Sequence, residues 1–509
     1  MKDPREEALI PVNRSTADPT RTSAQPRQSA GGTKLRKLSP TLANCFVLFH
    51  FITCSILWGY TYACRLIVQD NGASFADQSK LSIADYPYSF MFLITPLFDR
   101  FYSHRIGRSK TYILPVTMFL SIFCLIISTQ MKDLVEEVNT TPLTVYLFVL
   151  ALCMGTLTII GESWVLTLYD TEDLKSKAAN YIYIGENLGY FIGYNIFIPL
   201  NDTQWLNENI FTNNPLTEPL VSHTMILVFS SIFLALEFLI VLFFIKERSI
   251  KDEENQMSLL ELYKLVPKHF CNAHMRNFIF YTFASSMFYY SVYEAFDYTL
   301  VSNGHMDVSR STVTNIDSVA YPFVIVASYL VVYFIKKGQL VRMYHLNIVL
   351  NVCVGFFRYI AYIDLINNQN LTRTIVARSF IAFFIGCDFT GSFAFGFFNL
   401  IVDERYGNTG LSCLASIRDQ ALVMSSTIGF QIMELTGEQF YCLVGLSLQA
   451  FFLVILFPYA LKLDKKDPRL FDLNGPMKFS IKEDENPEPS PKTDSPSVNR
   501  AKPKDALYE

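Results

Sequence analysis

The stretch DYPYSFMFLITPLFDRFYSHRIGRSKTYILP, residues 85–115, decides the fold, because it joins two apolar segments through a short basic turn. The first segment ends at Asp99, and Gly107, Arg108 and Lys110 follow before the second segment continues. Apolar runs of about 20 residues span a bilayer as helices, and the cations that flank such helices are retained on the cytoplasmic side. The stretch therefore predicts two membrane-spanning helices joined by a cytosolic turn.

Composition extends this interpretation to the whole chain of 509 residues. Hydrophobic residues make up 51% of it and the mean hydropathy is +0.25, as is typical of a protein whose solvent is largely lipid. Twelve apolar segments predict an all-α membrane protein of two six-helix bundles, with connections too short for a catalytic domain, so we expect no enzyme. The segments lie at about residues 42–68, 78–98, 111–130, 143–168, 178–200, 222–245, 276–300, 312–335, 341–366, 374–400, 411–434 and 438–462.

Charge placement predicts the orientation and the domain boundaries. Lys and Arg are concentrated in the connections that follow even-numbered segments, which places both termini in the cytosol. The longest internal connection contains an amphipathic run at 259–266, which we expect to lie along the inner membrane surface. The expected divisions are a disordered tail at 1–40, a six-helix bundle at 41–245, a cytosolic linker at 246–275, a six-helix bundle at 276–464 and a disordered tail at 465–509.

Three Asn-x-Ser/Thr sites fall in connections expected on the lumenal side, at Asn139, Asn201 and Asn370. They favour an endomembrane location, with the endoplasmic reticulum first and the mitochondrial inner membrane as the alternative. The acidic residues Asp3 and Glu6 precede any apolar run, which argues against a cleaved secretory signal and against a mitochondrial presequence.

No motif indicates a bound cofactor or an ATP-driven pump. The chain has no CxxC pair, no HExxH and no Walker lysine motif, and its seven histidines show no metal-ligand spacing. The ten cysteines lie mostly inside the apolar segments, which argues against a disulfide framework. We therefore expect no cofactor, no metal and no nucleic-acid partner. The expected partners are the lipid bilayer and a small anionic substrate, and a homodimer or a membrane-complex partner stays open.

Four motifs in the first half of the chain recur together in one known family. They are Ser74-Phe75-x-Asp77-Gln78, Thr95-Pro96-Leu97-x-Asp99 within the opening stretch, Glu162-Ser163-Trp164, and Gly185-Glu186-Asn187-x-Gly189-Tyr190. With them the chain resembles the acetyl-coenzyme A transporter family, solute-carrier family 33 of the major facilitator superfamily. The resemblance implies transport of acetyl-coenzyme A from the cytosol into an organelle lumen by alternating access.

Departures from the family pattern fall on polar positions within the expected helices. The family's lysine in the second segment corresponds to Met91, an acid in the fourth to Thr158, and asparagines in the eleventh to Ala415 and Asp419. The missing lysine weakens the expectation of a substrate with several phosphate charges. Three alternatives stay open: a proton-coupled organic-solute porter, a muropeptide-type permease, and a non-transporting subunit of a larger membrane complex.

Charged residues at membrane depth are the candidate substrate and gating residues, because each costs about 3 kcal/mol at a helix centre unless it faces water or a partner. With one adjacent amide, the candidates are Arg65, Asp85, Glu162, Glu186, Asn187, Glu294, Asp297, Arg378 and Arg418. The alternative for each charge is a structural ion pair, which we favour for Glu237 and Arg358. The resemblance places Trp58, Tyr62, Tyr289 and Tyr290 beside the cavity as candidates for stacking on a flat base.

Depth counting along the helices, combined with the helix pairing that the resemblance implies, predicts two sets of opposed charges. Arg418 and Glu162 are expected to meet when the cytosolic side closes, and Arg65 to meet Glu294 and Asp85 on the lumenal side. Pairing offsets the desolvation of both charges. Arg418 is also expected to contact substrate phosphates.

Gly185, Gly189 and Gly193 lie on one face of the fifth segment, so that another helix can approach its backbone closely. This face is expected either to form ordinary packing or to slide against a helix of the other bundle.

Overall fold

The computed structural model describes residues 40–169, 172–245, 257–287, 289–302, 309–318, 340–368 and 406–464, together with residues 322, 398 and 402. Every regular element in these ranges is a helix, as expected for an all-α protein. The expected terminal tails and the segments at 319–335 and 374–400 fall almost entirely outside the described residues.

The helices of the first half of the chain lie between residues 40 and 243. They are α1 (Pro40–Asp70), α2 (Phe75–Ser82), η1 (Ile83–Asp85), α3 (Tyr86–Ser89), η2 (Met91–Leu93), α4 (Thr95–Arg100), α5 (Arg108–Ile127), α6 (Met131–Glu136), α7 (Thr140–Leu168), α8 (Glu172–Tyr190), η3 (Phe191–Ile196), α9 (Phe197–Asn201), α10 (Thr203–Asn209) and α11 (His223–Phe243).

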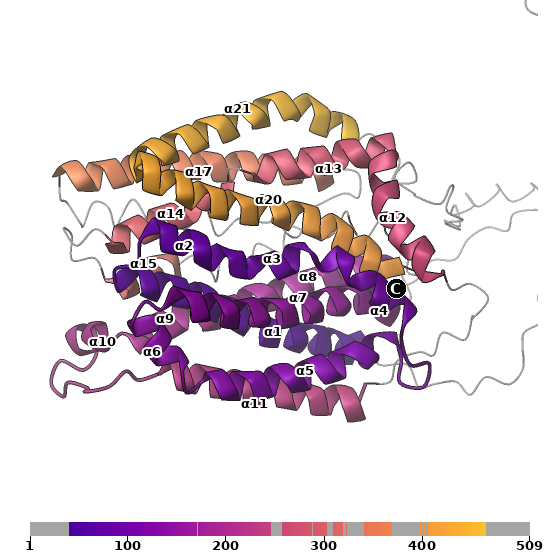
Figure 1. Ribbon diagram of the computed structural model, residues 1–509, viewed down its shortest axis with the longest axis horizontal. Helices are drawn as coiled ribbons and strands as arrows, with labels where there is room; N and C mark the ends of the chain where they lie inside the picture. The colour runs from indigo at the N-terminus through magenta and orange to yellow at the C-terminus, as the bar shows by residue number, and fades with distance from the viewer. Residues whose placement is uncertain are drawn as a thin grey trace, which may run out of the picture. The chain divides into compact units, whose positions relative to one another are not determined.

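The described helices of the second half begin at residue 259. They are α12 (Leu259–Cys271), α13 (Ala273–Ser286), α14 (Tyr289–Ser302), α15 (Arg310–Ser318), α17 (Leu340–Asn368), α20 (Gly407–Thr436) and α21 (Glu438–Asp464). Figure 1 shows α4 and α12 at one end of the helical bundle and α6, α9 and α10 at the other. These two ends are named here the Asp99 end and the Asp70 end, after residues in α4 and α1.

Six of the described helices are long and apolar enough to cross a bilayer. They contain the segments Thr41–Asp70, Arg108–Ile127, Thr140–Val165, His223–Phe243, Val341–Asp364 and Glu438–Tyr459. α5, α11 and α21 also expose large apolar side chains, among them Ile126, Phe243 and Val454. Side chains of this kind are stable on a protein surface that faces lipid rather than water.

The second expected segment is interrupted rather than continuous. Residues 75–100 form the short helices α2, α3 and α4, linked by the 3-10 turns η1 and η2. Pro87 and Pro96 each lie in the first turn of the helix that they begin. Proline has no backbone N–H and clashes with the preceding helical turn, so the helix restarts at each of them. The breaks leave polar backbone and side-chain groups of this segment free to turn toward α7 and α20, which pack against it.

The three glycines of the fifth segment pack against α1, a helix of the same half. A Cβ added at Gly193 would overlap the carbonyl oxygen of Ile56, and one at Gly185 would lie 2.9 Å from the Cβ of Phe51. The expectation of a sliding contact with the other bundle is therefore wrong, and ordinary close packing is what the structure shows. Phe191–Ile196, which contains Gly193, forms a π-helix.

The linker helix α12 packs on the Asp99 end of the bundle, against α4, α13 and α20. Its N-terminus is closed by a capping box of Ser258 and Glu261, and hydrogen bonds from Ser258 hold the pKa of Glu261 below its ordinary value. Leu262 and Leu265 are buried, whereas Leu260 is exposed. Tyr263 donates its hydroxyl to the carbonyl of Leu93 at 2.9 Å, at the break in the second segment. The amphipathic helix is thus present, and one of its faces covers the end of the bundle.

The α1–α8 contact predicts that Gly193→Val destabilises the protein. The added side chain meets backbone rather than a movable side chain, and overpacking of this kind costs about 1–3 kcal/mol. We expect a lower apparent melting temperature in thermal unfolding of the detergent-solubilised protein. Ile196→Val, in the same π-helical segment but at a side chain that is 39% exposed, is the control and should melt like the parent. Equal melting of all three proteins would contradict the packing described.

Candidate functional site

A cavity of about 330 Å³ lies between the first half of the chain and α20. Its described lining comes from α1, η1, α3, α7, α8 and α20 and consists of Ser55, Trp58, Tyr62, Asp85, Tyr88, Thr158, Glu186, Asn187, Tyr190, Asp419, Leu422 and Val423. This volume is in the range of small-molecule sites, and the mixture of aromatic walls with a few polar groups is typical of them.

Four aromatic side chains form part of the cavity wall. The rings of Trp58 and Tyr88 meet edge to face with centroids 5.7 Å apart, and those of Tyr62 and Tyr190 lie 5.7 Å apart. Two of the expected stacking residues, Trp58 and Tyr62, therefore line the cavity. For Tyr289 and Tyr290 the structure describes only the backbone of α14, so their side chains lie outside the described part of the molecule.

Three carboxylates line the same cavity, and its described lining contains no Lys or Arg. Asp85 and Asp419 each have a basic neighbour, described below. Glu186 has no hydrogen-bond or ion-pair partner within the described residues. The adjacent Asn187 donates its amide nitrogen to the carbonyl of Tyr183 in its own helix, at 2.8 Å. Glu186 is thus the lining carboxylate whose negative charge has no described cation or hydrogen-bond donor in contact with it.

Arg65 joins the two halves of the chain beside the cavity. It is 1% exposed, and its Nη2 lies 2.8 Å from Asp85 Oδ1 in an ion pair, while its Nη1 lies 4.0 Å from Glu294 Oε1. Its guanidinium also lies 5.2 Å from the centroid of the Tyr62 ring. The structure therefore brings together the three residues expected to oppose one another on the lumenal side. Glu294 further accepts a hydrogen bond from Ser426 of α20.

Arg418 does not form the ion pair with Glu162 that the sequence analysis expects. Its Nε and Nη2 both donate to Oδ1 of the adjacent Asp419, at 3.0 and 2.8 Å. Asp419 stands where the family pattern has an asparagine, so it supplies a nearer negative charge. Glu162 is 3% exposed, and neither of its oxygens accepts a hydrogen bond within the described ranges. The charges of Glu186, Arg418 and Asp419 act on it through space.

Asp99 caps the N-terminus of α20 from the other half of the chain. Its Oδ2 accepts the backbone N–H and the hydroxyl of Thr409, at 2.8 and 2.7 Å, and its Oδ1 accepts the amide of Asn408 at 2.8 Å. Nη1 of Arg108 lies 3.6 Å from the same carboxylate. Tyr406, the residue that precedes α20, provides no capping side chain, so Asp99 fills that position.

The basic turn that follows Asp99 holds the neighbouring helices. Gly107 has a φ of 112°, a backbone conformation that favours glycine, and it allows the chain to enter α5 directly. Lys110 donates to the carbonyl of Ile245 at 2.7 Å, just beyond the end of α11. Arg108 and Lys110, two of the cations of this turn, therefore make structural contacts.

Contacts between the two halves also occur at the Asp70 end. Ser79 of α2 donates to the carbonyl of Thr427 in α20 at 2.8 Å, and Arg310 of α15 lies 3.2 Å from Asp70 at the end of α1. Ser311 donates to Asp202 at 2.6 Å. Polar bonds thus tie the halves together at both ends of the cavity.

The remaining expected residues lie away from the described cavity lining or outside the described chain. Asp297 lies 3.9 Å from Arg358 between α14 and α17. Arg378 and Asn370 lie outside the described residues. Asn139 is exposed, whereas Asn201 is 9% exposed and donates its amide to the carbonyl of Val221 at 3.1 Å. A glycan on Asn201 would require that bond to break, so the structure does not favour this site.

Several residues of the site are not among the sequence-predicted candidates. Ser55, Tyr88 and Thr158 line the cavity, and the partners of Asp99, Asn408 and Thr409, lie at the start of α20. None of the four motifs in the sequence analysis includes Asn408 and Thr409, whose partner Asp99 lies more than 300 residues earlier.

The Arg65 cluster predicts a large difference between single and double variants. Arg65→Leu leaves Asp85 buried without its partner, which costs about 3–5 kcal/mol. Arg65→Leu with Asp85→Leu removes both charges of this pair and restores part of that loss, because Glu294 keeps its hydrogen bond from Ser426. Thermal unfolding of the purified proteins measures both effects. Arg310→Leu is the control, because its more exposed pair with Asp70 contributes about 1 kcal/mol or less. An Arg65→Leu protein that melts like the parent would refute the role given to this pair.

Part of the chain matches a known protein family in sequence. Residues 62–267 match the family model of acetyl-coenzyme A transporter 1. An uncharacterized membrane protein of Saccharomyces cerevisiae is 31% identical over 193 residues, 34% of each chain, and an uncharacterized protein of Schizosaccharomyces pombe is 27% identical over 139 residues, 27% of each chain. The matched region therefore spans about a third or less of these relatives.

Solved structures show the fold. FucP, a major facilitator superfamily transporter in the outward conformation, aligns with a TM-score of 0.51 at 12% identity, covering 84% of this chain and 99% of its own. The human organic anion transporter MFSD10 aligns with a TM-score of 0.56 at 12% identity, covering 82% of this chain and 100% of its own. These matches are to transporters, not to enzymes. The chain thus carries the sequence pattern of the acetyl-coenzyme A transporter family over residues 62–267, on the fold of a major facilitator transporter.

Proposed function

We propose that this protein moves a small organic solute across an internal membrane by alternating access, with the central cavity as its substrate site. The observation that carries the proposal is the position of that cavity, which is walled by helices of the first half and by α20 of the second. A site between two halves can be exposed to either side of a membrane when the halves rock against each other.

The two inter-halves clusters would serve as the opposing closures of this cycle. At the Asp99 end, α20 separates from α4 only if Asp99 gives up its bonds to Asn408 and Thr409. Toward the Asp70 end, opening breaks the contact of Arg65 with Glu294 and the bond of Ser79 to Thr427. Hydrogen bonds to charged groups contribute about 1.5–3 kcal/mol each, so each closure is held by a few such bonds and can be reopened by substrate binding energy.

The proposed membrane arrangement is twelve spans with both termini in the cytosol. Two bundles, 41–245 and 276–464, would be joined by a cytosolic linker at 246–275, and the Asp99 end would face the cytosol. Support comes from the cations that flank Asp99 and from α12 covering that end of the bundle. The endoplasmic reticulum is the membrane that we propose.

Acetyl-coenzyme A is the proposed substrate, moving from the cytosol into the lumen. The family match over residues 62–267 supports it. Trp58 and Tyr62 offer aromatic faces on which an adenine base stacks, and Arg418 lies beside Asp419 at the cavity wall, where rearrangement of that pair would present a cation to a phosphate.

A proton-coupled carrier of an uncharged or cationic solute is the second candidate, and the acidic cavity favours it. Asp85, Glu186 and Asp419 line the cavity without a described Lys or Arg among them, and Glu162 lies buried nearby without a hydrogen bond in the described part of the chain. A carboxylate at membrane depth that lacks a cation is stabilised by binding a proton. Glu186 would carry that proton to and from the cavity.

Reconstitution in liposomes separates the two candidates. Uptake of labelled acetyl-coenzyme A that is stimulated by unlabelled coenzyme A inside the vesicles, and is insensitive to a pH gradient, is the expected result. A second set of vesicles, with an inward proton gradient, compares uptake by the parent protein with uptake by Glu186→Gln. Glu208→Gln, in the exposed helix α10, is the matched control. Gradient-driven uptake that only Glu186→Gln abolishes would favour the second candidate. The absence of uptake under every condition would contradict both.

A further inference from the structure

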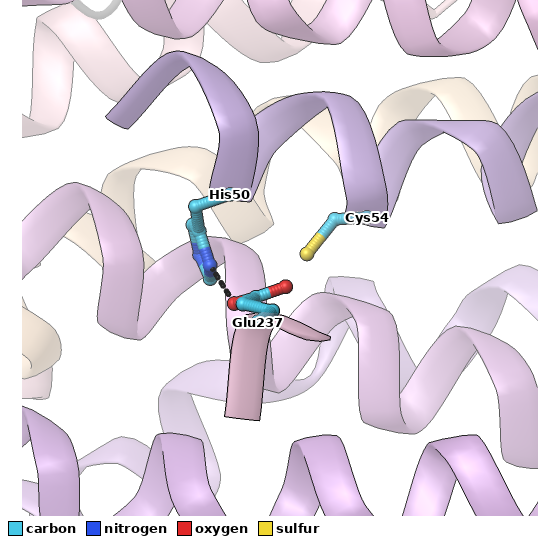
Figure 2. A group of neighbouring side chains, drawn as sticks. All are labelled: His50, Cys54 and Glu237. Atoms are coloured by element: carbon cyan, nitrogen blue, oxygen red, sulfur yellow. Dashed lines mark hydrogen bonds and ion pairs between the residues drawn. The ribbon is translucent and has the colours of Figure 1, made fainter. Parts of the chain in front are cut away.

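His50, Cys54 and Glu237 form a buried cluster that the proposed transport cycle does not use. His50 and Cys54 lie one turn apart on α1, and Glu237 comes from α11. Exposure of all three is 1% or less. One nitrogen, one sulfur and one carboxylate oxygen lie within 4.8 Å of one another. Figure 2 shows the Cys54 sulfur and the Glu237 carboxylate on the same side of α1, with the second carboxylate oxygen turned toward the sulfur.

The hydrogen bonds of His50 leave Nδ1 as the ring nitrogen that faces Glu237. Nε2 lies 3.1 Å from the carbonyl oxygen of Leu157, which only accepts, so Nε2 carries the hydrogen. Nδ1 lies 2.5 Å from Oε1 of Glu237. Two acceptor atoms approach this closely only when a cation, either a proton or a metal ion, lies between or beside them. A histidine that donates its other N–H to a backbone carbonyl is the usual form of a metal-ligating histidine.

A second observation, on the other carboxylate oxygen of Glu237, points to the same site. Oε2 of Glu237 is buried and has no hydrogen-bond partner within the described residues. The surroundings of the cluster are apolar and closely packed. The rings of Phe46 and Phe51 pack on His50, and a Cβ at Gly161 would overlap His50 Nε2. An isolated carboxylate oxygen in such an apolar place is costly. Coordination of a metal ion would satisfy this oxygen.

We propose that His50, Cys54 and Glu237 bind one Zn²⁺ ion that clamps α1 to α11. Thiolate and carboxylate together carry two negative charges, so a divalent cation leaves the buried site neutral. Imidazole, thiolate and carboxylate are all ligands of zinc, whereas magnesium and calcium take oxygen ligands and copper(I) prefers sulfur. If both oxygens of Glu237 bind, Oε2 reaches the metal at a narrower angle than a tetrahedral ligand would.

The ligand geometry requires only a local adjustment. Zinc bonds of about 2.0 Å to nitrogen and oxygen and about 2.3 Å to sulfur set tetrahedral ligand atoms about 3.3–3.5 Å apart. The Nδ1–Oε1 distance must therefore widen from 2.5 Å by rotation of the Glu237 side chain, and Cys54 must lose its proton. Ser55 and Trp58, further along α1, line the cavity, so the clamp fixes the helix that carries part of the substrate site.

Metal analysis of the full-length protein in detergent tests the proposal. After chelator treatment and exchange into zinc, elemental analysis should find about one zinc per chain, and exchange into cobalt should produce the absorption band of a cobalt–thiolate bond. Cys54→Ser should abolish the band, and Glu237→Gln should weaken zinc binding by about tenfold or more. Cys124→Ser, at an equally buried cysteine of α5, is the matched control and should retain both.

Two results would overturn the proposal. One is a parent protein that takes up neither zinc nor cobalt, in which case a shared proton occupies the contact between His50 and Glu237. The other is zinc uptake that Cys54→Ser leaves unchanged, because the metal then binds elsewhere. The cobalt spectrum of the parent protein needs no variant, so an unfolded variant does not leave the question open.

Discussion

The carboxylate of Asp99 at the N-terminus of α20 is the interaction on which the arrangement of the two halves depends. It accepts three hydrogen bonds from Asn408 and Thr409 and lies beside Arg108, so one side chain ties together α4, α5 and α20. The positive end of a helix dipole and a guanidinium stabilise the same anion. The contact is strong when formed but contains few bonds, as a reversible closure requires.

Rigid and separable contacts are distributed differently in this molecule. Within the first half, Gly185 and Gly193 bring the backbone of the fifth segment against α1, and a Cβ at either position would overlap α1, which leaves no space for sliding. Between the halves, the described contacts of α20 with α2 and α4 include many polar bonds, such as Ser79 to Thr427 and Thr95 to Ser412. The cavity lies between the closely packed first half and α20.

The sequence predicted the parts of this structure that depend on local pattern. Six of the expected apolar segments and the basic turn after Asp99 follow from hydropathy and charge. The opposition of Arg65 to Asp85 and Glu294 follows from counting residues along helices together with the helix pairing that the family resemblance implies. Contacts that depend on side-chain direction did not follow. Arg418 could turn toward Glu162 or toward its own neighbour Asp419, and depth counting treats both choices alike. The breaks at Pro87 and Pro96 have a local cause in the prolines, which a count of apolar residues does not weigh, whereas the meeting of His50 with Glu237 depends on tertiary packing.

Cross-linking α4 to α20 is the most direct test of the account. The hydroxyls of Thr95 and Ser412 lie 2.6 Å apart beside the Asp99 contact, so Thr95→Cys with Ser412→Cys places two thiols within reach of a disulfide. In a background that keeps the buried Cys54 as its only other cysteine, oxidation should stop uptake of labelled acetyl-coenzyme A into liposomes, and a reductant should restore it, while each single variant stays active. Undiminished uptake by the fully cross-linked protein would show that α4 and α20 do not separate during transport and would contradict the account.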